Sequence, residues 1–220
     1  MWDRQDDNAR HQARERMLQH DLQGRDITDA DVLRVMAEIP REKFVPQEHR
    51  GHAYADGPLP IGEGQTISQP YIVALMTQVL RVNRDSEVLE VGTGSGYQTA
   101  VLARLVGRVY TIEKFPALSA GAREILKGLG IKNVEFRVGD GSCGWPQDRT
   151  FDRIIITAAV PDFPEPVVAQ LAEAGVMVAP VGYGSVQQLT LGEKRQGKRI
   201  ERYICSCRFV KLIGEHGFPE

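Results

Sequence analysis

The sequence predicts an α/β fold: a central, mostly parallel sheet with helices on both faces, followed by a C-terminal antiparallel hairpin. Three observations predict it. Strand and helix patterns alternate from residue 86 onward, which is typical of a parallel sheet. An apolar run over 88–91 breaks abruptly into glycines at 92, 94 and 96, and a helical pattern follows. Near the end, strand patterns over 186–191 and 200–213 flank a charged tip, as in a hairpin.

The N-terminal third is predicted to be helical, with one long loop before the sheet. The first twenty residues are charged and Gln-rich and suit a partly frayed helix. Thr28–Asp31 resembles a capping box with Asp in place of Glu, and the amphipathic helix that it opens ends at Pro40. Residues 51–70 are rich in Gly and Pro and have no clear period. Because they include apolar side chains, we expect an ordered, functional loop.

The remaining elements follow from apolar runs with glycine or proline boundaries. Strands are expected at 88–91, 109–113, 134–138, 151–158 and 175–180, and helices at 71–80, after Gly96, at 115–129 and from 164. The 151–158 strand is nearly continuous in apolar residues, so we expect it to be buried on both faces. One domain should span 1–220, with 1–80 as a helical and loop extension on the substrate side and 81–220 as the cofactor-binding sheet.

Composition narrows the functional class. The 220 residues carry a net charge of −2, so nothing marks a protein that binds nucleic acid or an anionic membrane. No apolar stretch approaches the length of a membrane span, and the polar, acidic start is unlike a secretory signal. Cys205 and Cys207 lack companion ligands, so we expect core residues and no metal site. Three cysteines make no disulfide framework, which favours a cytoplasmic protein.

The glycine loop after the 88–91 strand predicts a cofactor site. Alternate glycines let a ligand approach the backbone, and free N–H groups at the next helix start can bind a polar or anionic group. A dinucleotide fingerprint needs Gly or Ala at position 97, where Tyr97 stands. Glu90, just before the first glycine, would repel a pyrophosphate. S-adenosylmethionine, a sulfonium without phosphate, suits this acidic rim better.

Two further acids follow neighbouring strands. Glu113 ends the second strand, where a carboxylate can accept bonds from both ribose hydroxyls. Asp140 lies between two glycines beyond the third strand, where it can accept a bond from an adenine amino group. Alternatively, Glu113 is a solvated strand-end acid and Asp140 only forms a turn. Three acids at successive strand ends make that alternative less attractive.

Ser68 precedes the apolar helix that Pro70 opens. Its simplest role is to cap the helix N-terminus, which this stretch alone favours. The alternative role is to hold an anion beside that N-terminus, together with backbone N–H groups.

From about residue 15 to about residue 215 the chain resembles the protein-L-isoaspartate (D-aspartate) O-methyltransferase family. The glycine motif occurs in many methyltransferases, whereas two other segments are far more specific: R-E-K-F-V-P at 41–46 and Q-T-I-S-Q-P at 65–70. Segments 53–61 and 151–159 also match. Two residues depart from the family pattern: Lys211 stands where Pro is expected, and Cys143 follows Gly-Asp-Gly-Ser.

The resemblance implies a Rossmann-like class I methyltransferase fold, S-adenosylmethionine as donor and S-adenosylhomocysteine as product. It identifies Ser68 as the active-site serine and implies that the 54–68 loop faces the substrate. The implied substrate-binding residues are Tyr54, Asp56, Thr66, Ile67, Ser68 and Val210. The expected cofactor-binding residues are Glu90, Gly92, Thr93, Gly94, Gly96, Tyr97, Glu113, Lys114, Asp140, Gly141 and Thr157.

The implied reaction moves a methyl group to the α-carboxylate of an L-isoaspartyl residue in a damaged protein or peptide, which initiates repair through a succinimide. A carboxylate is already ionised at neutral pH, so no general base is needed among the five His. Catalysis should come from aligning oxygen, methyl carbon and sulfur. We expect a monomer without nucleic-acid or membrane partners.

Two other functions stay open. A methyltransferase acting on nucleic acid or a small metabolite is one, although amine methylation would need a polar, Pro-rich stretch where Thr157–Val160 offers no Asn or Asp. The other is a non-catalytic binding module that keeps the nucleotide pocket only for stability.

Overall fold

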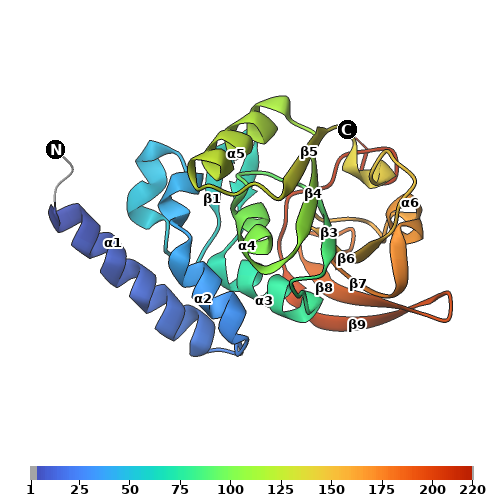
Figure 1. Ribbon diagram of the computed structural model, residues 1–220, viewed down its shortest axis with the longest axis horizontal. Coiled ribbons are helices and arrows are strands. Elements are labelled where there is room, and N and C mark those ends of the chain that lie inside the picture. Colours follow the sequence, from blue (N-terminus) through green and yellow to red (C-terminus); the bar gives the residue numbers. More distant parts are fainter. Residues whose placement is uncertain (1–3, 220) are drawn as a thin grey trace.

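The computed structural model describes residues 4–219, and its centre is a seven-stranded sheet (Figure 1). The strands are β3 (Glu87–Val91), β4 (Arg108–Glu113), β5 (Val134–Val138), β6 (Phe151–Ile156), β7 (Leu171–Val181), β8 (Gln187–Arg195) and β9 (Lys198–Cys207). Their order is β5-β4-β3-β6-β7-β8-β9. The first five pair in parallel, and β8 and β9 pair antiparallel, so the expected sheet and hairpin are confirmed. The chain order reverses between β3 and β6, the place where such sheets bind ligands.

Helices cover both faces of this sheet. They are α1 (Arg4–Arg16), α2 (Ala30–Glu38), α3 (Pro70–Leu80), α4 (Tyr97–Leu105), α5 (Pro116–Gly128) and α6 (Glu165–Ala169). Shorter helical segments are η1 (Met17–Gln23), η2 (Arg41–Phe44), η3 (Gln47–His52) and η4 (Gly141–Cys143). Among the described helices, none is both long and apolar enough to cross a membrane.

Strand alternation divides the core into two layers. Val88 lies in the core beneath α2, α3 and α4, whereas Leu89 and Val91 lie in the core on the opposite face, where α6 packs. Figure 1 shows α1 projecting from the body beside α2, away from the sheet. The elements N-terminal to β3 therefore cover one face and one end of the sheet.

Four local predictions differ from the structure. The strand expected over 200–213 is β9, which already ends at Cys207. Within 51–70, expected to be an irregular loop, β1 (Leu59–Gly62) and β2 (Gln65–Ile67) form an antiparallel hairpin. The N-cap of α2 is Asp29, one residue after Thr28, and its side chain accepts bonds from the N–H groups of Asp31 and Val32. Since Val32 occupies the N3 position, the cap is not the expected capping box. The β8–β9 turn is only Gln196-Gly197, because the flanking charged residues belong to the strands.

After β9 the chain returns across the carboxyl edge of the parallel strands. Lys211 forms an isolated parallel bridge with Ala159, which follows β6. Val210 O accepts a bond from Ala159 N–H at 2.7 Å, and Leu212 N–H donates to Ala159 O at 2.8 Å. This segment, residues 208–219, is called the tail below. It brings the C-terminal part of the chain over the end of β6.

Candidate functional site

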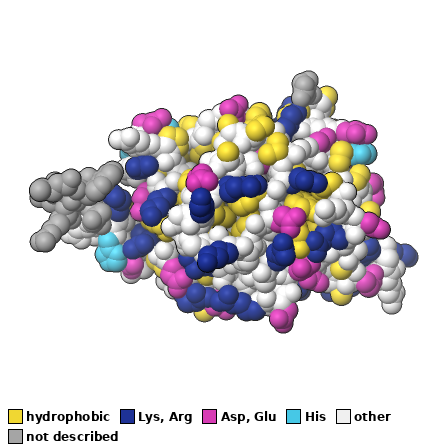
Figure 2. Space-filling view, turned by 45° about the horizontal axis from the view of Figure 1, so that its top comes forward, with side chains coloured by type: hydrophobic (Ala, Val, Ile, Leu, Met, Phe, Trp, Pro, Cys, Tyr) yellow, Lys and Arg dark blue, Asp and Glu magenta, His cyan; other side chains and the backbone are white. Residues whose placement is uncertain are grey.

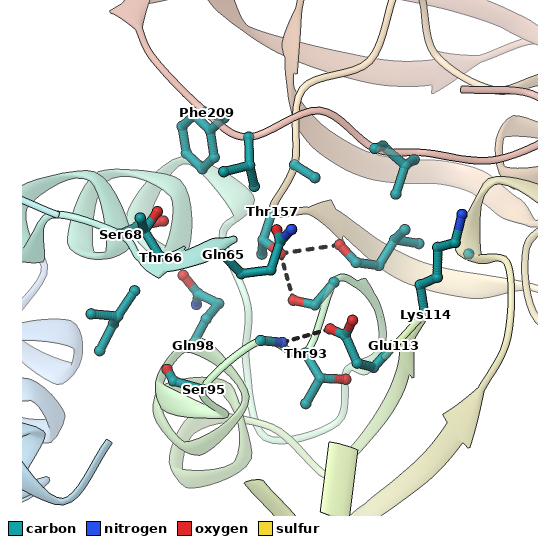
Figure 3. Close-up of a pocket in the computed structure, with 18 of the residues that line it drawn as sticks. Gln65, Thr66, Ser68, Thr93, Ser95, Gln98, Glu113, Lys114, Thr157 and Phe209 are labelled. Carbon is teal, nitrogen blue, oxygen red and sulfur yellow. Dashed lines mark hydrogen bonds between the residues drawn. The ribbon is translucent and has the colours of Figure 1, made fainter. Parts of the chain in front are cut away.

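A cleft of about 920 Å³, including space open to solvent, lies at the carboxyl edge of the sheet. Three segments wall it: 65–68 before α3, the glycine loop 92–95 with the start of α4, and 209–213 of the tail. The ends of β4 and β6 supply its floor through 112–115 and 157–158. Figure 3 shows Ser68 and Phe209 at one end and Glu113 and Lys114 at the other. The cleft therefore has a place for a small cofactor and a second place beside Ser68.

The three glycines of the glycine loop have two different roles. The backbone at Gly92, Gly94 and Gly96 has φ of +98°, +53° and +85°, which other residues rarely adopt. A Cβ on Gly92 would lie 2.4 Å from Thr157 Oγ1, and one on Gly96 would lie 2.8 Å from the Ala122 Cβ on α5. Only at Gly94 would a Cβ meet no atom nearer than 3.6 Å. Gly94 is thus the glycine that opens the backbone to a ligand, whereas the other two permit close packing.

Glu113 is a buried acid that fixes the glycine loop. Its side chain is 6% exposed. One carboxylate oxygen accepts the Gly94 N–H at 2.8 Å, and the other accepts the Phe115 N–H at 3.0 Å. The alternative of a solvated strand-end acid is therefore wrong. A carboxylate has lone pairs beyond these two bonds, so ribose hydroxyls can still be accepted here.

Glu90 lies beneath α4 and not on the cleft wall. It is fully buried, and its Oε2 accepts bonds from the Thr99 hydroxyl at 2.5 Å and the Thr111 hydroxyl at 2.7 Å. Burial raises the pKa of Glu90 to about 8, against the lowering effect of those two bonds. At pH 7 the side chain is then mostly neutral, so the argument that Glu90 gives the cleft an acidic rim is wrong. Its link to the cleft is indirect, because the Thr93 hydroxyl lies 2.6 Å from that of Thr111.

Asp140 ties the tail to the sheet. Its Oδ1 accepts the N–H and the hydroxyl of Ser142 at 2.9 and 2.7 Å, and its Oδ2 accepts the Glu215 N–H at 2.7 Å. Burial raises the pKa of Asp140, but these bonds outweigh it and the net direction is downward. A Cβ on Gly214 would lie 2.1 Å from Asp140 Oδ1, so the tail approaches closely. Asp140 is outside the cleft lining, whereas its neighbour Gly141 is part of it.

Next to Asp140, the side chains of Cys143, Glu215 and His216 place possible ligand atoms within 4.8 Å of one another. All three side chains are exposed, so solvent competes for any cation there. We assign this group no role.

The substrate-side residues Thr66, Ile67 and Ser68 line the cleft beside Val210 of the tail. Helix α3 begins at Pro70, its N-cap residue is Gln69, and no side chain caps it. The prediction that Ser68 caps this helix is therefore wrong. Ser68 is half-buried, and Figure 3 places its side chain at the cleft next to Phe209.

Tyr54 and Asp56 hold the loop and do not line the cleft. The Tyr54 hydroxyl donates to Glu42 Oε2 at 2.6 Å, and burial, followed by that bond, raises the pKa of Tyr54. Asp56 forms an ion pair with Arg25 and accepts a bond from the Gln69 amide at 2.6 Å. Both side chains are occupied by other parts of the N-terminal region.

Of the predicted cofactor residues, the cleft brings together Gly92, Thr93, Gly94, Tyr97, Glu113, Lys114, Gly141 and Thr157. Glu90, Gly96 and Asp140 support it from outside. Sequence reasoning missed further lining residues: Gln65, Val73, Met76, Val91, Ser95, Gln98, Ile112, Phe115, Ala158, Phe209, Lys211, Leu212 and Ile213.

Signals for two of the missed residues exist in the sequence. Gln98 follows the last glycine by two residues, and its amide donates to Thr77 on α3 at 3.0 Å. Lys211 directly follows the predicted Val210. Its neighbours Val210 and Leu212 make the two bonds of the bridge to Ala159, which does not use the Lys211 N–H. Proline, which lacks that N–H, and lysine therefore both fit the position.

Comparisons with known proteins are consistent with this site. The family model described as protein-L-isoaspartate(D-aspartate) O-methyltransferase (PCMT) matches residues 12–217. The chain is 50% identical over 207 residues to a protein-L-isoaspartate O-methyltransferase of Trichlorobacter lovleyi, covering 94% of this chain and 95% of the relative. It is 51% identical over 207 residues to that of Magnetococcus marinus, covering 94% and 90%.

Two solved structures share the fold. A structure named protein-L-isoaspartate O-methyltransferase superposes with a TM-score of 0.82 at 31% identity, over 93% of this chain and 67% of the other. A putative one from Plasmodium falciparum, in complex with S-adenosyl-L-homocysteine, superposes with a TM-score of 0.78 at 27% identity, over 90% and 96%. With the family model covering almost the whole length and relatives half-identical in sequence, this chain belongs to the protein-L-isoaspartate(D-aspartate) O-methyltransferase family.

Proposed function

We propose that this protein transfers the methyl group of S-adenosylmethionine to the α-carboxylate of L-isoaspartyl residues in damaged proteins and peptides. The backbone nitrogen of the next residue then attacks the carbonyl carbon of the ester, methanol leaves, and the succinimide that forms initiates repair. The observation that carries the proposal is that one cleft joins Ser68 to the glycine loop at Gly94, in a chain that belongs to this family. One end suits an adenosyl group, and the other presents the hydroxyl of Ser68.

The cleft residues fit this cofactor. The backbone at Gly94 is open, and Glu113 retains acceptor capacity for ribose hydroxyls. Lys114, Gly141 and Thr157 complete the lining around them. S-adenosylmethionine supplies a methyl group on a positively charged sulfur. The uncharged glycine backbone and a buried carboxylate accommodate such a group better than the phosphates of a dinucleotide.

The substrate end needs orientation rather than proton transfer. A carboxylate oxygen attacks the methyl carbon, a C–O bond forms, the S–C bond breaks, and its electron pair returns to sulfur. The nucleophile is ionised near neutral pH, and none of the five His lines the cleft. We propose that the Ser68 hydroxyl holds the carboxylate in line with the methyl group, while Thr66, Ile67 and Val210 position the surrounding peptide.

Tyr54, Asp56, Glu90, Gly96 and Asp140 then act indirectly in this proposal. Their contacts fix the substrate loop, the glycine loop and the tail, as described above. We also propose that the protein acts as a monomer in the cytoplasm, on protein rather than nucleic acid. On the face that Figure 2 shows, Lys and Arg side chains across the middle have Asp and Glu side chains among them, so this face is not uniformly basic as a nucleic-acid-binding surface would be.

The test uses labelled S-adenosylmethionine and two peptides that differ only in an isoaspartyl or an aspartyl residue. We expect label on the isoaspartyl peptide alone. Equal or absent labelling of both peptides would refute the proposal. Label on bulk RNA or DNA would favour a nucleic-acid methyltransferase instead. Calorimetric binding of the cofactor without turnover would favour a binding module.

A further inference from the structure

The segment R-E-K-F-V-P at 41–46, one of the two specific motifs, has no part in the chemistry described so far. Its first residue, Arg41, is completely buried, the largest such side chain among the described residues. Its Nε donates to Ala53 O at 2.7 Å, and its Nη2 donates to Ser68 O at 2.7 Å. These two carbonyl groups stand at the two ends of the loop that contains the β1–β2 hairpin. One guanidinium therefore joins both ends of that loop.

Arg41 is held without an acidic partner. Among the described residues no carboxylate forms an ion pair with it, and its Nη1 has no hydrogen-bond partner. The guanidinium carbon lies 4.6 Å from the ring centroid of Tyr97, a buried cleft residue whose hydroxyl interacts electrostatically with Arg41. Burying a cation in this way is unfavourable for folding. The two bonds to carbonyl oxygens offset part of that cost and give the group a role beyond core packing.

Only arginine suits this arrangement among the basic residues. Its planar group presents donors in a fixed fork, so two carbonyl oxygens from distant segments can be held at once. Lysine offers a point charge on a flexible stem and can satisfy one carbonyl at a time. The neighbouring Glu42 also holds the loop, because its carboxylate accepts the Tyr54 hydroxyl.

The loop that Arg41 joins reaches the cofactor side of the cleft. The hairpin residue Ile61 places its Cδ1 3.6 Å from where a Cβ on Gly94 would stand. Thr66, Ile67 and Ser68 follow on β2 and just beyond it, and they line the cleft. The backbone of Ser68 is therefore fixed on one side by Arg41 and on the other by the start of α3.

We infer that Arg41 is the positioning residue of the substrate site: by binding the carbonyls of Ala53 and Ser68 it sets the Ser68 hydroxyl and the β1–β2 hairpin against the glycine loop. This inference rests on the proposed function for its substrate, an anionic isoaspartyl carboxylate. Arg41 does not line the cleft, so it acts through Ser68 and does not touch the reacting atoms.

The test compares R41Q and R41K with R34Q as a matched control. Arg34 is an exposed arginine of α2 that pairs with Asp31 and Glu38 at the surface. For R41Q we expect kcat/KM on the isoaspartyl peptide to fall by about 100-fold, as for losing two charge-assisted bonds. The KM for peptide should rise, and the Kd for S-adenosylhomocysteine should be unchanged. R41K should recover part of the loss, and R34Q should behave as the wild type.

A second readout follows the loop itself. The hairpin tip carries the exposed Glu63, so a Glu-specific protease should cut there faster in R41Q than in R34Q, and cofactor should not abolish the difference. A folded R41Q with wild-type kcat/KM, or one that loses cofactor affinity by the same factor as peptide activity, would overturn the inference.

If R41Q does not fold, hydrogen exchange of the wild-type protein tests whether the two ends of the loop are fixed. The amides of 53–55 and 67–69 should exchange far more slowly than those of 62–64. Equal exchange of the three segments would show that Arg41 does not fix the loop. Should the wild type fail to methylate the isoaspartyl peptide, the proposed function fails, whereas the protease and exchange results still decide whether the guanidinium holds the loop.

Discussion

Replacing Glu90 with glutamine tests whether a neutral carboxyl group lies beneath the glycine loop. The pKa of this buried group is raised from 4.5 to about 8, chiefly by burial. Between those values the folded protein holds a proton that the unfolded chain has released. The contribution of Glu90 to stability is therefore fully present below pH 4.5 and is lost as the pH rises through the folded pKa.

Each pH unit in that window costs the folded state about 1.4 kcal/mol. From pH 5.5 to pH 7.5 the wild type loses folding stability on the order of 3 kcal/mol. E90Q should not show this loss, because the glutamine side chain does not titrate. The glutamine oxygen can accept the same bonds from Thr99 and Thr111, so both proteins should be comparably stable at pH 5.5. At pH 7.5 E90Q should be the more stable.

Urea unfolding at several pH values measures the difference. The control is E124Q, which removes a carboxylate from the exposed surface of α5 and should keep the pH dependence of the wild type. If E90Q and the wild type lose stability in parallel across the window, the buried carboxyl is not neutral at pH 7 and the reasoning is refuted.

Further variants separate the two ends of the cleft. S68A should lower kcat/KM for isoaspartyl peptide by about 10- to 100-fold, the effect of one bond to a charged group, without changing cofactor affinity in calorimetry; equal losses would make Ser68 merely structural. E113A should weaken cofactor binding first, by roughly tenfold or more, because Gly94 N–H and the ribose lose an acceptor; an unchanged Kd would contradict this role. G96A should lower the melting temperature, because its Cβ meets Ala122 at 2.8 Å and overpacking costs about 1–3 kcal/mol. G94A, where space is open, should lose more cofactor affinity than packing stability, and the reverse order in calorimetry and thermal melts would be evidence against the assignment of the two glycines.

Much of the fold follows from local patterns. The apolar run before Gly92 and the acid at Glu113 identify two parallel strands and the edge at which they end, and the structure confirms both strands. The β1–β2 hairpin escaped prediction because Pro60, Gly62 and Gly64 interrupt the alternation that marks a strand. Its register depends on contact with the glycine loop, which lies far along the chain.

The role of individual acids was harder to predict. Glu113 ends β4, whereas Glu90 lies one residue before the end of β3 and pairs with Thr111, two residues before Glu113. Both side chains therefore lie on the same face, but Glu90 is deeper, beneath α4, and Glu113 reaches the cleft. The register between the two strands sets that difference, and the sequence alone does not reveal it. Asp140 meets the tail 75 residues later, and Arg41 meets Ser68 27 residues later. Contacts between such distant segments leave no periodic trace.

The tail has a consequence for the order in which the cleft is completed during folding. Residues 209–213 form one wall of the cleft, and Asp140 and Ser142 fasten the segment around Glu215. The strands of the sheet pair with one another without these contacts, so the sheet can form before the tail docks. Until the tail docks, the cleft lacks one side.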